Sequence, residues 1–225
     1  MKKGFTLAEV LITLGIIGVV AAITIPSLMT AHKAHRLRAQ FLKSYSTIQQ
    51  AFRQMEADDV STDISSYSGK MGSFYKTFKS YFKGVHECGF YTNTSKNLPC
   101  LGMGEHNYKS LDGKYTISSD YFTDGQFVLP DGTLVMIDNP NWGDFVWIFV
   151  DLNGYKNPPN RWGYDLFTFE FINGELKTMG DIQTKYNDQE KYCNINSTGI
   201  TNGMACANKA KNNTDYFKWI VKNVK

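Results

Sequence analysis

The sequence has little of what enzymes use for chemistry, and none of it is arranged as a known catalytic motif. It contains four histidines, no glycine-rich phosphate-binding loop and no Ser/His/Asp spacing. We therefore predict that the protein is not an enzyme and has no catalytic residues. Its net charge of +3 is too close to neutral to indicate a polyanionic partner. No internal repeat is present.

Charge is also nearly absent from residues 5–25, where Glu9 is the one charged side chain. As a helix these 21 residues would rise about 31 Å, roughly the thickness of the hydrocarbon core of a membrane. A carboxylate at the centre of a membrane helix costs about 2.5–3.5 kcal/mol, and less near an end. We therefore expect Glu9 to have a partner, either Lys2 or Lys3 or an amine on a neighbouring helix.

The start of the chain resembles the N-terminal signal of type IV pilins and type II secretion pseudopilins. The resemblance covers residues 1–30 and depends on a short basic leader, Gly4-Phe5-Thr6-Leu7, Glu9, the apolar run and Pro26. It implies that a prepilin peptidase cuts between Gly4 and Phe5 and that the new N-terminal Phe5 is methylated. It also implies that Glu9 neutralises the N-terminal amine of the adjacent subunit during assembly.

Two plainer interpretations compete with this resemblance. A secretory signal peptide has an apolar core of 7 to 15 residues followed by a small-residue cleavage site, which Ala21-Ala22 imitates. Glu9 inside the run argues against that interpretation. A simple membrane anchor explains the length and apolarity of the segment, but neither Glu9 nor the Gly4-Phe5 pair.

The resemblance predicts an α+β, pilin-like fold with a long N-terminal helix packed on an antiparallel sheet. The predicted parts are a leader (1–4), a transmembrane or filament-core helix (5–26), its amphipathic continuation (27–57) and an extracytoplasmic β-rich head (58–225). The expected partners are copies of itself or other pilin-like subunits, the peptidase, an inner-membrane assembly platform and membrane lipid. The expected location is the inner membrane, with the head outside the cytoplasm, and later a filament. Counting Lys and Arg on either side of the segment does not by itself place the N-terminus inside.

All four cysteines lie beyond the apolar segment: Cys88, Cys100, Cys193 and Cys206. An even number outside the membrane indicates disulfides, with three possible pairings. The simplest pairing makes two local loops of about a dozen residues, each stabilising by roughly 3 kcal/mol. His86 and His106 flank the first two cysteines and suggest zinc, but their spacing is irregular for a structural zinc site.

After Pro26 the pattern stays helical, since a proline within a membrane helix kinks it rather than ending it. Apolar residues then recur at helical spacing in one stripe that we expect to pack on the sheet: Leu37, Phe41, Tyr45, Ile48, Phe52 and Met55. One helix is therefore predicted from about Phe5 to Ala57. Next to the membrane segment, His32, Lys33, His35, Arg36 and Arg38 form a basic cluster. Lipid headgroups, a neighbouring subunit or solvent are the alternatives for its surroundings.

Residues 70–83 alternate aromatic and basic side chains, which could bind single-stranded nucleic acid by stacking. Phe74, Phe78 and Phe82 stand four apart, however, so a short amphipathic helix is the simpler interpretation.

The head has the period of β-strands. Predicted strands are 115–117, 126–129, 133–137, 145–150, 166–172 and a short return strand after Asn173-Gly174, giving a sheet of about four or five strands. Pro130-Asp131-Gly132 predicts a hairpin turn. In the tail from Asp181, we expect Phe217, Trp219 and Ile220 to dock the last segment on the body.

A loop between the two strongest predicted strands is crowded with side-chain oxygens, from Asp151, Asn153, Asn157, Asn160 and Asp165. These could bind calcium, which takes six to eight oxygen ligands. The loop is similar to calcium-stabilised loops of some major pseudopilins. The alternative is a loop held by its own Asx-turn hydrogen bonds. No other cofactor is expected.

The alternative to a filament subunit is a membrane-anchored binding protein, or a minor pilin whose head recognises a sugar, DNA or a secreted substrate. An anchored hydrolase is a third class.

Overall fold

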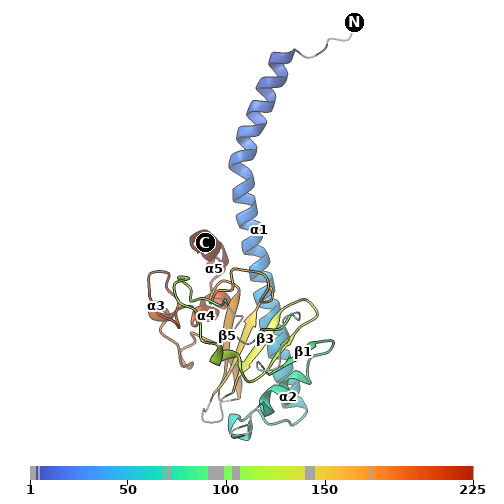
Figure 1. Ribbon diagram of the computed structural model, residues 1–225, viewed down its shortest axis with the longest axis vertical. Helices are drawn as coiled ribbons and strands as arrows, with labels where there is room; N and C mark the ends of the chain where they lie inside the picture. The colour runs from blue at the N-terminus through green and yellow to red at the C-terminus, as the bar shows by residue number, and fades with distance from the viewer. Residues whose placement is uncertain are drawn as a thin grey trace.

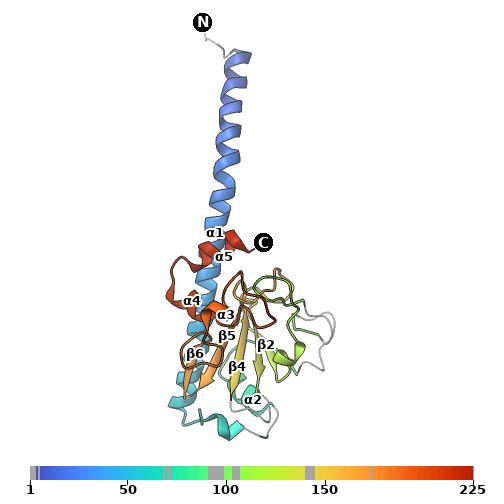
Figure 2. The same ribbon diagram turned by 90° about the vertical axis from the view of Figure 1, so that its left-hand side faces the viewer.

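The computed structural model describes most of the chain, namely residues 4, 6–67, 69, 72–90, 99–102, 107–139, 145–172 and 174–224. It has one very long N-terminal helix with a head built around its second half (Figures 1 and 2). The first half of the helix projects from the head with no other segment beside it. This arrangement confirms the α+β, pilin-like layout expected from the sequence.

The helix α1 spans Leu7–Ala57, 51 residues, and continues through Pro26 without a break. Its N-terminal half carries threonines whose hydroxyls donate to the carbonyl four residues earlier, as Thr24 does to Val20 at 2.9 Å. These bonds satisfy side-chain polarity inside an apolar segment. Among the residues described, α1 is the one helix long and apolar enough to cross a membrane, and none of its most apolar stretch is buried in the head.

The head contains a six-stranded antiparallel sheet in simple chain order. The strands are β1 (His86–Gly89), β2 (Gln126–Val128), β3 (Leu134–Asp138), β4 (Val146–Asp151), β5 (Leu166–Ile172) and β6 (Glu175–Thr178). The predicted hairpin joins β2 to β3, with Gly132 at φ +89° where a side chain would be strained. Five of the predicted strand segments are confirmed within one or two residues.

Two sequence predictions about the sheet are wrong. Residues 115–117 form no sheet strand; Thr116 makes one isolated bridge with Lys109, because a turn at Asp112-Gly113 folds the segment back on its own neighbour. The edge strand β1 is not predicted, because its four residues show no clear alternation. The first two are exposed, the third is buried and the fourth is partly buried. The sheet therefore has six strands rather than four or five.

One face of the sheet packs on the second half of α1. The predicted stripe is confirmed: Leu37, Phe41, Ile48, Phe52 and Met55 are buried, and Tyr45 is partly buried against the same core. Phe41 contacts Phe167 of β5 with ring centroids 4.7 Å apart. Phenylalanines alternate along β5, so all three reach this face.

The opposite face is covered too, by the loops between β1 and β2 and after β4. Thr168 and Glu170 lie on this face and are buried with partners: the indole Nε1 of Trp162 donates to Thr168 at 3.0 Å, and that of Trp147 donates to Glu170 at 3.1 Å. The polar positions of β5 therefore line a second core rather than solvent.

The short helices decorate the head. They are the 3₁₀ turns η1 (Ile64–Tyr67) and η3 (Ser119–Phe122) and the helices α2 (Ser73–Lys79), α3 (Gln189–Tyr192), α4 (Cys206–Asn212) and α5 (Tyr216–Asn223). The helix α5 packs against α1 at the level where α1 leaves the head (Figures 1 and 2). Phe217 and Ile220 are buried there as predicted, but Trp219 is 36% exposed, because it lies on the outer side of α5.

Both disulfides are local, Cys88–Cys100 and Cys193–Cys206. The second joins the end of α3 to the first residue of α4 and so ties the C-terminal helices to the body.

Candidate functional site: the N-terminal helix and its junction with the head

The carboxylate of Glu9 has a partner within its own helix. Thr6 precedes the first helical residue in an extended conformation, and its hydroxyl accepts a hydrogen bond from the Glu9 amide at 3.3 Å. In return, Glu9 Oε2 accepts from the Thr6 amide at 2.8 Å and the Thr6 hydroxyl at 2.9 Å. This is a capping box, in which two otherwise unpaired backbone donors of the helix start are satisfied reciprocally.

The sequence analysis names Lys2, Lys3 or an amine of a neighbouring subunit as the partner of Glu9 and does not predict this role of Thr6. A threonine three residues before a glutamate is nevertheless the signal of a capping box. Lys2, Lys3 and Phe5 lie outside the described residues. Gly4 is exposed, and a side chain at its position would meet no atom within 4 Å. The peptide bond that a prepilin peptidase would cut therefore follows a residue that is exposed to solvent.

Beyond Glu9 the helix presents an uncharged, mainly apolar surface. Its large apolar side chains from Val10 to Met29 are between 41% and 71% exposed. Exposed apolar surface on this scale marks contact with a membrane or with other proteins.

The oxygen-rich loop between β4 and β5 divides into two groups. Asn153 and Asn157 bond to each other, each side-chain amide to the other's backbone carbonyl, near the surface. Asp151 and Asp165 lie instead in the fully buried part of the loop, and the buried Asn160 donates its side-chain amide to the Tyr155 carbonyl at 2.8 Å. The side-chain nitrogens of the three asparagines are thus bonded within the loop, whereas the side-chain oxygens of Asn153 and Asn160 are buried without a hydrogen-bond partner among the described residues.

The two buried carboxylates already accept hydrogen bonds at all four oxygens. Asp151 accepts from the Tyr108 hydroxyl at 2.7 Å and from the Asn153 amide at 3.2 Å. Asp165 accepts from the backbone amides of Asn160 at 2.9 Å and Arg161 at 2.7 Å. Donors of the chain itself therefore hold both carboxylates, in the way that the Asx-turn interpretation expects.

Burial dominates the electrostatics of this acid pair. It raises the pKa of Asp151 to about 8, with the nearby charge of Asp165 adding to the rise. Burial likewise raises the pKa of Asp165 to about 6, against the lowering effect of the amides of Arg161 and Asn160. The pKa of Tyr108 rises well above its usual value because it is buried beside Asp151. Burial thus favours the protonated form of both carboxyl groups.

The cysteines suspected of binding zinc have a structural role instead. Cys88 and Cys100 are bonded to each other, and His106 lies outside the described residues, so the zinc interpretation loses both thiolates. Within the portion of the chain that is described, no group of three His, Cys, Asp or Glu residues could hold a metal ion.

The aromatic residues of 70–83 face inward. Phe74 and Phe78 of α2 are completely buried against Phe52, while Lys79 pairs with Glu87 of β1. The amphipathic helix is confirmed over Ser73–Lys79, and Phe74 and Phe78 pack in the core.

Comparison with known proteins places one segment of the chain. Residues 1–25 match the family model described as the prokaryotic N-terminal methylation motif, which is the signal of type IV pilins and pseudopilins. The motif implies processing by a prepilin peptidase and assembly with other pilin subunits. Neither the curated proteins nor the solved structures contained a match to the chain.

Proposed function

We propose that the protein is a structural subunit of a filament, either a type IV pilus or a type II secretion pseudopilus. One observation carries the proposal: residues 1–25 match the methylation motif, and they begin a helix that continues into the head. The apolar half of this helix is exposed outside the head. A plain anchor would need the apolar half but not the motif.

In this proposal the subunit waits in the inner membrane with its head outside the cytoplasm. After cleavage behind Gly4, the apolar half exchanges lipid for the same half of other subunits. Its role is mechanical rather than catalytic. Assembly requires no new apolar surface, since about 30 Å of exposed apolar helix is already present.

Glu9 would act as the switch between the two states. In the single subunit its carboxylate is held by Thr6. On assembly it would pair with the positively charged N-terminal amine of Phe5 in the next subunit, inside a bundle from which water is excluded. A charge pair gains strength in such a medium of low dielectric constant.

The test uses three variants in a host supplied with a prepilin peptidase and either a pilus or a pseudopilus assembly machine. Gly4→Ala should leave an uncut precursor. Glu9→Gln keeps the length and an oxygen that accepts from Thr6, but not the charge; it should be cut normally and excluded from sheared filaments. Glu56→Gln, an exposed glutamate at the far end of α1, is the matched control and should assemble.

Mass spectrometry of the mature N-terminus and immunoblots of sheared filaments give the readouts. A mature chain starting elsewhere than Phe5, or wild-type levels of Glu9→Gln in filaments, would refute the proposal. Assembly into fibres by the pilus machine would identify the protein as a pilin, and assembly by the pseudopilus machine would identify it as a pseudopilin.

A further inference from the structure

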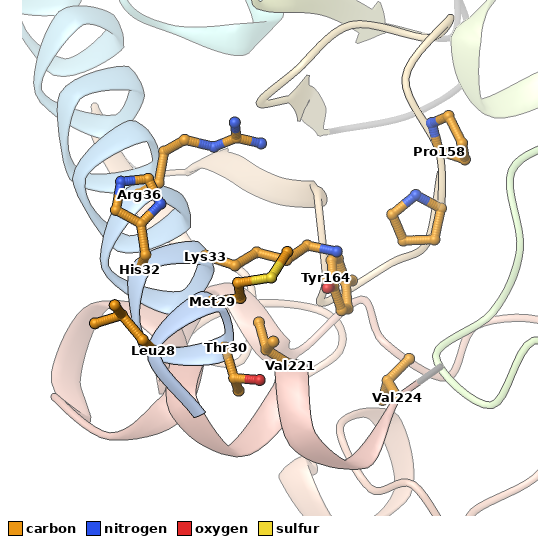
Figure 3. A pocket seen from close by; sticks show the side chains of 11 residues that line it. Leu28, Met29, Thr30, His32, Lys33, Arg36, Pro158, Tyr164, Val221 and Val224 are labelled. Atoms are coloured by element: carbon orange, nitrogen blue, oxygen red, sulfur yellow. The ribbon is translucent and has the colours of Figure 1, made fainter. Parts of the chain in front are cut away.

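A groove lies where α1 leaves the head, between α1, α5 and the Pro158-Pro159 segment, with a volume of about 890 Å³ (Figure 3). Its apolar lining comes from both helices and the sheet loop, and consists of Leu28, Met29, Tyr164, Val221 and Val224. The basic side chains of the lining, which we call the rim, all come from α1: His32, Lys33 and Arg36. The chains of Lys33 and Met29 extend side by side from α1 towards Tyr164 (Figure 3).

The rim is positively charged and lacks a matching acid. No carboxylate lines the groove, and the ion pairs found in the described portion of the chain include neither Lys33 nor Arg36. The ammonium of Lys33 lies 5.1 Å from the centre of the Tyr164 ring. Asp165 interacts electrostatically with Lys33, but its side chain is fully buried and already accepts hydrogen bonds from two backbone amides. An anion entering from solvent would therefore find two free cationic groups.

The height of the groove along α1 places it at a membrane surface. If the uncharged part of α1, Val10–Ala31, spans the hydrocarbon core, Lys33 lies about 3 Å and Arg36 about 8 Å beyond it. The headgroup layer is about 5–7 Å thick, and long basic side chains reach back along an apolar surface to keep their charge at its level. The apolar lining thus adjoins the acyl chains, and the rim adjoins the phosphates.

We propose that this junction groove binds one anionic phospholipid of the leaflet on the side of the head. Its phosphate lies between Lys33 and Arg36, and the first part of an acyl chain lies on Met29 and Val221. The inference rests on the proposed function, because it requires the unassembled subunit to sit in a membrane.

A second copy of the chain is the competing occupant, and charge argues against it. The apolar half of a neighbouring helix has no charged residue from Val10 to Ala31. Such a helix could cover Leu28 and Met29 but would leave Lys33 and Arg36 without an acidic partner. A phosphodiester supplies that charge and an acyl chain together.

The test uses the full processed chain in micelles of a neutral detergent doped with palmitoyl-oleoyl phosphatidylglycerol or phosphatidylcholine. Native mass spectrometry counts the lipids retained per subunit and gives an apparent Kd. Lys33→Gln/Arg36→Gln should weaken phosphatidylglycerol binding by about thirtyfold, the effect of two basic contacts with anionic lipid. It should leave phosphatidylcholine binding nearly unchanged.

The matched control removes the same charge at the far end of the head, with Arg53→Gln/Lys76→Gln, both exposed. It should bind like the wild type. Lys33→Arg/Arg36→Lys should also retain binding, and millimolar inorganic phosphate should not compete, since it lacks the acyl chain. All four basic residues are exposed, so circular dichroism should show every variant folded.

Equal loss in the control pair, or unchanged phosphatidylglycerol binding in Lys33→Gln/Arg36→Gln, would overturn the inference. So would a pattern in which that variant keeps its lipid but loses subunit–subunit crosslinks at the groove, which would assign the surface to a second copy. Because lipid binding is measured before assembly, a failure of filament formation with normal lipid selectivity would count against the proposed function alone.

Discussion

Phe52 of α1 stacks on Phe171 of β5, with ring centroids 4.4 Å apart and an angle of 20° between the ring planes. The two residues are 119 positions apart in the sequence, and both are buried. Phe74 and Phe78 of α2 extend the same aromatic cluster. The contact joins the second half of α1 to the sheet. It thereby helps to fix the direction in which the exposed first half of α1 leaves the head.

Phe52→Ala should therefore lower the free energy of unfolding of the head by about 3–5 kcal/mol, the usual cost of removing a buried aromatic ring and leaving a cavity. Urea denaturation of the full chain in neutral detergent, followed by near-ultraviolet circular dichroism, measures it. Leu42→Ala on the same helix is the control, because Leu42 is 38% exposed; its loss should stay below about 1 kcal/mol. Similar losses in both variants would show that the stack does not anchor the helix.

The stability of the head should depend on pH through Asp138 at the end of β3. Burial raises the pKa of Asp138 to about 7, and the charge of the neighbouring Asp124 adds to the rise. The folded state therefore binds this proton more tightly than the unfolded state, whose pKa is near 3.8. Stability should fall as pH rises from about 4 to 7, by at most about 1.4 kcal/mol per pH unit for one group.

Asp138→Asn should flatten this slope. Some slope should remain in the variant, because burial also raises the pKa of Asp151 and Asp165. Urea midpoints at several pH values between 4 and 8 give the two slopes, with Asp188→Asn, an exposed helix-capping aspartate, as the control. A slope of opposite sign, or one unchanged by the substitution, would contradict the assignment.

Calcium should leave the melting temperature of the head unchanged. The oxygens of Asp151 and Asp165 are already bonded within the chain, and Asn153 and Asn157 are bonded to each other. Thermal denaturation with excess chelator and then with millimolar calcium checks this. A rise with calcium that disappears in Asp165→Asn would show instead that the loop rearranges around the ion, by the linkage between binding and folding.

Removing the Cys193–Cys206 disulfide should cost about 3 kcal/mol in the chain-entropy model for a loop of this length. Replacing both cysteines by serine should also loosen α5, since the bridge holds α4, which leads directly into it. Hydrogen exchange of residues 206–224 measures that local effect. The matched Cys88→Ser/Cys100→Ser variant opens a loop of similar length and should lose similar stability while α5 stays protected. Equal loosening of α5 in both variants would reject the local role.

Much of this architecture could be predicted because it depends on neighbours in sequence. The stripe from Leu37 to Met55 follows the helical period, and the alternation along β5 follows the strand period. The hairpin at Gly132 depends on a local turn whose residues are adjacent. Strand β1 could not be predicted in this way, because its partner strand β2 lies about 40 residues along the chain. The bridge between Thr116 and Lys109 is local, but it depends on the turn at Asp112-Gly113 and not on the alternation of residues 115–117.

The candidate loop shows the same division. Its oxygen-rich composition was visible in the sequence, but the pairing of Asn153 with Asn157 through their side-chain amides was not. Thr6 is the opposite case. Its spacing from Glu9 is the pattern of a capping box, so this partner of Glu9 could have been predicted from the sequence.

By itself the sequence determined that a long apolar helix with a methylation motif begins the chain and that a disulfide-bearing β-rich head follows, because helical period, apolar length and motif spacing are properties of consecutive residues. Only the tertiary structure decided which side chains α1 shares with the sheet, that Asp151 and Asp165 lie together without solvent, and that α5 meets α1 to form the groove below Lys33 and Arg36. The contacts of α1 with the sheet and with α5 join residues about a hundred positions apart or more, and the burial of Asp151 and Asp165 depends on how the whole core packs around them.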